Sequence, residues 1–81
     1  MRKVLIIGAG GIGSFLIPLL KKTGLYSIRV ADPDIVENKN LPYQNYDKVD
    51  VNKNKAQVMY ERYELEGMVP HKILTLGQMK G

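Results

Sequence analysis

Two short stretches of this 81-residue chain contain residues whose types and spacing could do chemistry. In the first, GAGGIG, the residues Gly8, Gly10 and Gly13 fit the spacing G-x-G-x-x-G. The second begins at Asp32, 19 residues after Gly13, and has another acid at Asp34. Glycines so spaced between a strand and a helix let a phosphate approach the backbone, and the helix N-terminus offers free N–H groups. An acid about 20 residues further on can bind ribose hydroxyls, so the two stretches predict a nucleotide site.

Apolar patterning supplies the elements that would position these residues. Residues 3–7 form a continuous aliphatic run, which is typical of a strand buried on both faces of a parallel sheet. A helix is predicted over 14–22, with two lysines and a glycine at its end, and a second strand over 26–31. After a long connection, apolar residues at three- and four-residue spacings predict a helix over about 51–66. Residues 71–76 are predicted to form a short third strand.

The order strand, helix, strand, helix, strand is typical of an α/β fold with a parallel sheet. We therefore predict a Rossmann-like β-α-β-α-β half, with a three-stranded parallel sheet of order 3-2-1 and both helices on one face. The first strand is then left at an open edge, although residues 4–7 are apolar on both faces. We expect residues 1–81 to form a partial nucleotide-binding domain, incomplete without a second copy, a partner chain or a C-terminal remainder.

Composition argues against several other classes of function. The chain is 44% hydrophobic and 25% charged, as ordinary globular proteins are. It has no cysteine and a single histidine, His71, so neither thiolate chemistry nor a metal site is predicted. The net charge is +4, but the basic residues are scattered, and this pattern does not predict nucleic-acid binding.

The N-terminus resembles a signal peptide in two respects. It has a basic start and an uncharged apolar run over residues 4–20. Glycines and a proline interrupt that run, and the glycines have the spacing described above. We therefore expect a cytoplasmic protein without a membrane segment.

The segment after the second predicted strand is more specific than a general nucleotide fold requires. DPDIVENKNLPYQ, preceded by GAGGIGS and followed by KNKAQVM, resembles the ThiF/MoeB family of adenylyltransferases, which includes ubiquitin-activating enzymes. The family pattern here is Asp-x-Asp-x-Val-Glu-x-x-Asn-Leu-x-Arg-Gln. Seven residues of this chain fall on it: Asp32, Asp34, Val36, Glu37, Asn40, Leu41 and Gln44. The similarity runs over about residues 2–63.

The resemblance implies a reaction and a set of ligands. Such enzymes bind ATP with Mg²⁺ and adenylate the C-terminal carboxylate of a ubiquitin-like or sulfur-carrier protein. By the family pattern, Asp32 would hold the ribose hydroxyls, Asn40 and Gln44 would line the phosphate end, and Lys55 would meet the phosphate charge as the catalytic residue. The residues expected to bind the nucleotide are Gly8, Gly10, Gly11, Gly13, Asp32, Asp34, Asn40, Gln44 and Lys55. The Mg²⁺ ligand is not expected within this chain.

Departures from the family pattern leave other interpretations open. Tyr43 replaces the arginine, and Asn52 and Asn54 stand where the family has a glycine and a proline ahead of its lysine. We expect the nucleotide-binding half of an adenylyltransferase, without the complete catalytic set. The alternatives are a non-catalytic nucleotide-binding or interaction module of the same family, and the N-terminal half of an NAD-dependent oxidoreductase.

Individual residues also have structural alternatives. The glycines could form a tight turn without a ligand, and acids such as Asp34 could be solvated loop residues. Asn40 could close a turn through its side chain. Lys55 could be an ordinary exposed lysine near a helix start, although the helix dipole does not favour it there. Val36 and Leu41 are expected to be packing residues.

Overall fold

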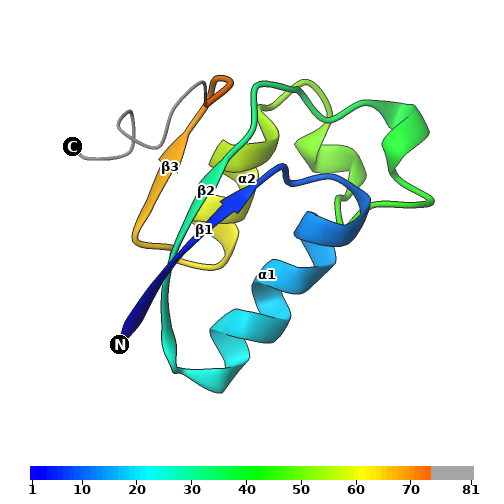
Figure 1. The fold of residues 1–81 in the computed structure, drawn as a ribbon. Coiled ribbons are helices and arrows are strands. Elements are labelled where there is room, and N and C mark those ends of the chain that lie inside the picture. Colours follow the sequence, from blue (N-terminus) through cyan, green and yellow to red (C-terminus); the bar gives the residue numbers. More distant parts are fainter. Residues whose placement is uncertain (74–81) are drawn as a thin grey trace.

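The computed structural model describes residues 1–73 and contains an open three-stranded sheet with two α-helices (Figure 1). The elements in chain order are β1 (Arg2–Ile7), α1 (Gly11–Thr23), β2 (Tyr26–Ala31), the 3-10 turns η1 (Asn38–Asn40) and η2 (Lys48–Asp50), α2 (Lys55–Arg62) and β3 (Gly67–Val69). The strands are parallel and lie in the order β1-β2-β3. The predicted Rossmann-like arrangement is thus confirmed.

The β1–α1–β2 unit follows the sequence prediction closely. β1 pairs with β2 along its whole length, from Arg2 opposite Tyr26 to Ile7 opposite Ala31. α1 ends in a glycine cap, because Gly24 takes the left-handed conformation and its N–H donates to the carbonyl of Lys21. The basic last turn of α1 also suits the negative end of the helix dipole.

Both helices cover the same face of the sheet, as predicted (Figure 1). Ile28 and Val30 project from β2 into one core together with Ile17 of α1 and Met59 of α2, and all four are at most 2% exposed. This packing places the carboxyl ends of β1 and β2 beside the first residues of both helices. The polar residues of the predicted nucleotide site lie at those ends.

The second helix is shorter than predicted. α2 begins at Lys55 because the preceding residues take another path: Asn52 has a positive φ of 74°, and the Asn54 side chain accepts from the N–H of Gln57 as an N-cap. It ends at Arg62, since Glu64 has a φ of 51° and cannot continue the helix. The prediction over 51–66 is therefore wrong at both ends.

The third strand was predicted in the wrong place. β3 is Gly67–Val69, and it pairs with the last three residues of β2. Met68 packs against the core from this strand. Residues 71–73 form no strand, and the rest of the predicted segment, 74–76, lies outside the described residues.

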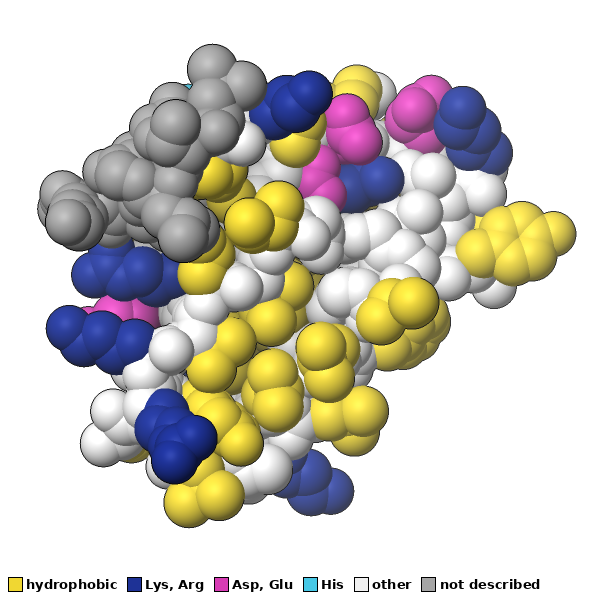
Figure 2. Space-filling model, viewed as in Figure 1, with side chains coloured by type: hydrophobic (Ala, Val, Ile, Leu, Met, Phe, Trp, Pro, Cys, Tyr) yellow, Lys and Arg dark blue, Asp and Glu magenta, His cyan; other side chains and the backbone are white. Residues whose placement is uncertain are grey.

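Apolar side chains remain exposed on the outer side of β1 and α1. The N–H groups of Arg2 and Gly8 point toward β2, so the alternate residues 3, 5 and 7 direct their backbone groups to the open edge. Beside this edge α1 carries a second apolar stripe with the spacing i, i+3, i+4, i+7: Ile12, Phe15, Leu16 and Leu19. Figure 2 shows hydrophobic side chains gathered over this region. We call the edge and stripe together the open-edge surface.

Within residues 1–73 neither α-helix is long and apolar enough to cross a membrane.

Candidate functional site

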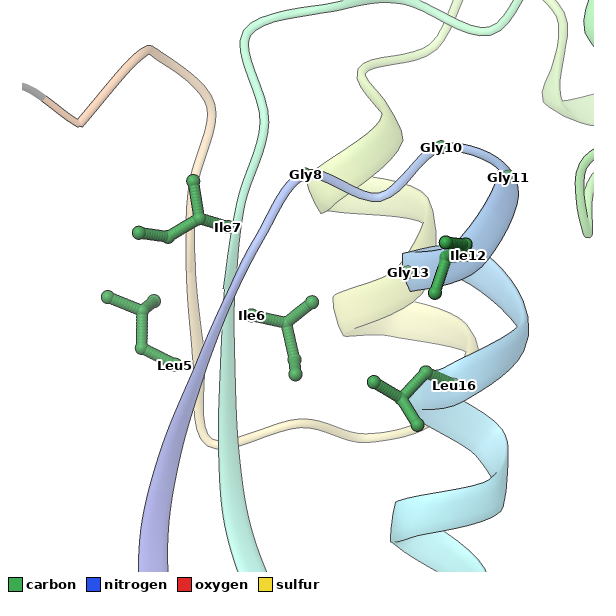
Figure 3. Close-up of a pocket in the computed structure, with 9 residues that line it drawn as sticks. All are labelled: Leu5, Ile6, Ile7, Gly8, Gly10, Gly11, Ile12, Gly13 and Leu16. Carbon is green, nitrogen blue, oxygen red and sulfur yellow. The ribbon is translucent and has the colours of Figure 1, made fainter.

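The glycine loop joins β1 to α1 with geometry that two of its glycines make possible. Gly8 has a φ of 95°, a conformation that other residues rarely adopt. A Cβ at Gly13 would overlap the Gly8 carbonyl oxygen, so only glycine lets the helix pack this closely on the strand. Gly10 and Gly11 instead border an open groove between β1 and α1 (Figure 3).

The N-terminus of α1 is open for a ligand. Gly10 is its N-cap residue and offers no side chain, and the first helical turn contains no acid. The first N–H groups of a helix have no acceptor within it, and the helix dipole gives them a partial positive charge. The N–H groups at this end of the 13-residue helix can therefore donate hydrogen bonds to an anion.

Asp32 lies at the carboxyl end of β2 and holds the glycine loop. Its Oδ2 accepts from the N–H of Ala9 at 2.6 Å, and its Oδ1 accepts from the N–H of Asp34 at 2.8 Å. The residue is 5% exposed. A carboxylate has about four acceptor positions, so two remain for further donors such as hydroxyls.

Lys55 is buried, which contradicts the alternative of an ordinary exposed lysine. Only 6% of its surface is exposed, yet no carboxylate of residues 1–73 lies within 4.0 Å of its ammonium. Its backbone N–H donates to the carbonyl of Asp34 at 2.9 Å, which places it beside the loop that follows Asp32. In the described part of the chain, Gln44 Oε1 is the only fully buried side-chain nitrogen or oxygen without a hydrogen-bond partner. The Lys55 ammonium, which also has no such partner, is therefore not fully buried and keeps access to solvent.

Asn54 is a site residue that the sequence prediction treated only as a departure. Besides capping α2, its Nδ2 donates to the carbonyl of Asp32 at 2.8 Å and to that of Asp34 at 3.3 Å. It therefore joins the start of α2 to the end of β2. The signal was present in the sequence, because an Asn followed three residues later by Gln57 is a typical helix start.

The remaining predicted residues are brought to the same end of the sheet in different ways. Asp34 is exposed and contributes its backbone, which fits its structural alternative. Asn40 Oδ1 accepts from the N–H of Glu37 at 2.8 Å, so it does close a turn, while its Nδ2 is left for another acceptor. The amide nitrogen of Gln44 approaches Gly10, since a Cβ built there would lie 3.6 Å from it. Val36 and Leu41 pack against the core, as predicted.

Tyr43, which stands in place of the family arginine, is 78% exposed. Its carbonyl oxygen lies near Gly11, but its side chain donates no hydrogen bond to residues 1–73. The structure thus gives Tyr43 no part in holding the loop.

An ion pair fixes the segment that follows Gln44. Arg62 Nη2 donates to both carboxylate oxygens of Asp50 at 2.7 Å, and the N–H of Asp47 donates to Asp50 as well. Burial alone would raise the pKa of Asp50, but these hydrogen bonds outweigh it and hold the pKa below its usual 3.8. η2 is thereby anchored to α2.

No group of three potential metal ligands occurs among residues 1–73.

A parallel sheet with a glycine loop after its first strand and an acid after its second defines the Rossmann-like class of α/β proteins. The ThiF family model matches residues 1–71 of this chain. The chain belongs to the ThiF family, as its resemblance to the ThiF/MoeB pattern predicted.

Known proteins of this family align with the greater part of the chain. It is 39% identical over 64 residues to a probable molybdopterin-synthase adenylyltransferase of Gracilaria tenuistipitata var. liui, covering 78% of this chain and 18% of that protein. It is 42% identical over 57 residues to the NEDD8-activating enzyme E1 catalytic subunit of Caenorhabditis elegans, covering 69% and 13%. The crystal structure of Escherichia coli tRNA N6-threonylcarbamoyladenosine dehydratase, TcdA, in complex with ATP matches with a TM-score of 0.81 at 29% identity, over 89% of this chain and 32% of that chain. This chain therefore spans at most about a third of the length of each.

Proposed function

We propose that this chain is the ATP-binding portion of an adenylyltransferase that activates the C-terminal carboxylate of a ubiquitin-like or sulfur-carrier protein. Membership of the ThiF family supports this proposal, as do relatives named as an adenylyltransferase and as a NEDD8-activating enzyme. A related structure solved with ATP supports the choice of nucleotide.

The buried Lys55 is the observation that carries the proposal. An ammonium at the first residue of a helix faces the positive end of the helix dipole, and here it has no carboxylate partner within residues 1–73. Full burial of such a charge would be costly without an opposite charge, and the ammonium keeps some access to solvent, through which an anion could reach it. The hydrogen bonds through Asp34, Asn54 and Asp32 connect it to a glycine loop whose helix also lacks an anionic cap. A phosphate group would satisfy both features.

The proposed roles follow from the donors and acceptors that remain. The two free acceptor positions of Asp32 would take the ribose hydroxyls. The loop from Gly8 to Gly13 would lie against the phosphates, with Lys55 supplying positive charge. Asn40 and Gln44 would donate through their side-chain amides, and Asp34 would act through its backbone.

In the proposed reaction a carboxylate oxygen of the carrier protein attacks the α-phosphorus of ATP. A new bond from that oxygen to phosphorus forms, the bond to the bridging oxygen of the β-phosphate breaks, and pyrophosphate leaves with the electron pair. The residues of this chain would contribute by positioning and by charge stabilisation. Residues 1–73 contain no group of three potential metal ligands, so Mg²⁺ would enter with ATP and be held elsewhere.

A thermal-shift titration with ATP and Mg²⁺, run in parallel with NAD, tests the choice of nucleotide. We expect ATP to raise the melting temperature in a concentration-dependent manner and NAD to have little effect. Stabilisation by NAD without stabilisation by ATP would favour the oxidoreductase alternative and reject the proposal.

A non-catalytic nucleotide-binding module of the same family is the second candidate, and Tyr43 is the observation that favours it. Arginine would supply a permanent charge and a bidentate fork to phosphate oxygens, whereas this exposed tyrosine supplies one neutral hydroxyl. Exchange of radioactive pyrophosphate into ATP, measured with candidate carrier proteins, separates the two candidates. ATP binding without exchange would identify the module.

We also propose that a second copy of this chain, or another chain, covers the open-edge surface. Three residues of β1 direct backbone hydrogen-bonding groups to that edge, and exposed edges of this kind readily pair with another strand. The adjoining groove is lined by glycine and aliphatic residues alone, so the surface suits an apolar strand or helix (Figure 3). Ile12 is 84% exposed and Leu19 is 64% exposed on the same side.

Light scattering after size-exclusion chromatography tests this surface. We expect the purified chain to self-associate, and Leu19→Lys to shift it toward the monomer. Val49→Lys is the matched control, because Val49 is an apolar residue of similar exposure, at 72%, on η2 outside the surface. An ordered monomer of the unmodified chain would contradict self-association through this face.

A further inference from the structure

Two consecutive residues, Asn45 and Tyr46, contact both ends of the glycine loop. Near the start of the loop, the Tyr46 hydroxyl donates to the carbonyl of Ala9. After it, the N–H of Asn45 donates to Ser14 Oγ, and Asn45 Nδ2 donates to the Ser14 carbonyl, both at 3.0 Å. Ala9 and Ser14 are fully buried, so these contacts lie inside the protein. Neither Asn45 nor Tyr46 belongs to the family pattern recognised in the sequence.

The contact with Ala9 determines where the next amide points. The N–H of Ala9 is held by Asp32, and its carbonyl is held by Tyr46, so both peptide groups that flank Ala9 are fixed. In a trans peptide the C=O and the following N–H point in opposite directions. Tyr46 is 5% exposed and draws the Ala9 carbonyl inward, and the N–H of Gly10 is therefore directed away from the core.

Without such a contact the loop would have other conformations available. Glycine at position 10 permits rotation of the Ala9–Gly10 peptide at little steric cost, because glycine is favourable at both signs of φ. Burial, reinforced by the carboxylates of Asp32 and Asp50, raises the pKa of Tyr46 well above its usual 10.0. The phenol thus remains protonated and able to donate at any physiological pH.

We infer that Tyr46, supported by Asn45, is a positioning residue that fixes the Gly10 amide outward and so prepares the glycine loop for a phosphate before the ligand arrives. The inference rests on the proposed nucleotide site for its ligand. It does not depend on that site for the contact between Tyr46 and Ala9. Asn45 adds a second link, because its Nδ2 also donates to the Tyr63 hydroxyl at 2.8 Å.

The test compares Tyr46→Phe with Tyr60→Phe. The first change removes only the hydroxyl that donates to Ala9 and keeps the packed ring. Tyr60 is a partly buried tyrosine that packs against the same core, and its hydroxyl makes no hydrogen bond to residues 1–73. Amide hydrogen exchange is measured on the ligand-free chain, with Gly8 and Ala9 as reporters because both loop amides donate to acceptors at the carboxyl end of β2. ATP affinity is measured by calorimetry in the presence of Mg²⁺.

We expect exchange at Ala9 to accelerate roughly tenfold in Tyr46→Phe, with the amides of β2 unchanged, and the dissociation constant for ATP to rise roughly three- to tenfold. Tyr60→Phe should change neither. Equal loop exchange in the two variants would overturn the inference, as would equal ATP affinity if the unmodified chain binds ATP.

The outcomes separate this inference from the proposed function. Failure of the unmodified chain to bind ATP would reject the proposed function, while exchange in the free chain would still decide whether Tyr46 holds Ala9. If Tyr46→Phe does not fold, Ser14→Ala takes its place. That change removes the acceptor of the Asn45 N–H and should accelerate loop exchange in the same direction; unchanged exchange would overturn the inference.

Discussion

Replacement of Lys55 by methionine should stabilise the ligand-free chain and weaken its binding of ATP. Methionine keeps most of the length and the apolar stem of Lys55, a residue that is 6% exposed. It removes a charge that has no carboxylate partner in residues 1–73 and lies at the unfavourable end of a helix dipole. Removal of the unfavourable dipole interaction and of a partly desolvated charge should raise the free energy of unfolding by about 0.5–2 kcal/mol. For a chain of this size each 1 kcal/mol corresponds to a rise in melting temperature of about 4–8 °C.

The loss of affinity follows from the same charge. A hydrogen bond to a charged group contributes about 1.5–3 kcal/mol, so the dissociation constant for ATP should rise by roughly 10- to 150-fold. Denaturant melts and calorimetric titrations measure the two effects on the same samples.

Lys53→Met is the control for Lys55→Met, because Lys53 precedes the same helix but is exposed. It should change stability by less than about 0.5 kcal/mol. Destabilisation by Lys55→Met, or unchanged ATP affinity, would refute the assignment of Lys55 as a buried cation that awaits an anion.

Three further predictions concern the loop, the altered family position and the ion pair. Gly13→Ala should lower the free energy of unfolding in urea melts by about 2–4 kcal/mol, because its Cβ would overlap the Gly8 carbonyl. Gly11→Ala, whose Cβ would have no atom nearer than 3.9 Å, should leave stability within about 0.5 kcal/mol. It should nevertheless weaken ATP binding by placing a methyl group beside the groove. Tyr43→Arg should tighten ATP binding or raise pyrophosphate exchange, because arginine adds a charged, bidentate donor for phosphate oxygens. If neither changes, the tyrosine at position 43 does not limit nucleotide binding or catalysis. Asp50 has a lowered pKa, so its stabilising effect is complete above about pH 4 and is lost as the pH falls through its folded-state value below 3.8; Asp50→Asn should cost about 1–3 kcal/mol at pH 7 and flatten the acid limb of the stability curve.

The N-terminal half of the fold was predictable because local sequence and tertiary contacts agree there. The aliphatic run of β1, the glycine cap of α1 and the alternation in β2 each specify one element and its ends. The C-terminal half was less predictable because its boundaries depend on backbone conformation. Asn52 and Glu64 take positive φ values that bound α2, and apolar spacing does not report them. β3 was missed because Gly67 can end a helix or begin a strand, and only its pairing with Arg29 decides.

The candidate site was predictable where residues act through their identity, and less so where they act through contacts. The glycine spacing and Asp32 could be recognised in sequence, and the structure brings them together through the Ala9 amide. The burial of Lys55 could not be read from its neighbours in sequence. Tyr46 was missed because its role depends on a hydrogen bond to a residue 37 positions away.

The absence of a side-chain cap at the start of α1 has a consequence for the lifetime of the protein as well as for recognition. A phosphate bound there would act as a removable cap, and its binding energy would be added to the folding energy of the whole domain. At a ligand concentration 100 times the dissociation constant this addition is about 2.7 kcal/mol, a large fraction of the stability of a small domain. Resistance of the chain to proteolysis would then follow the supply of nucleotide, so that depletion of ATP would expose the protein to degradation.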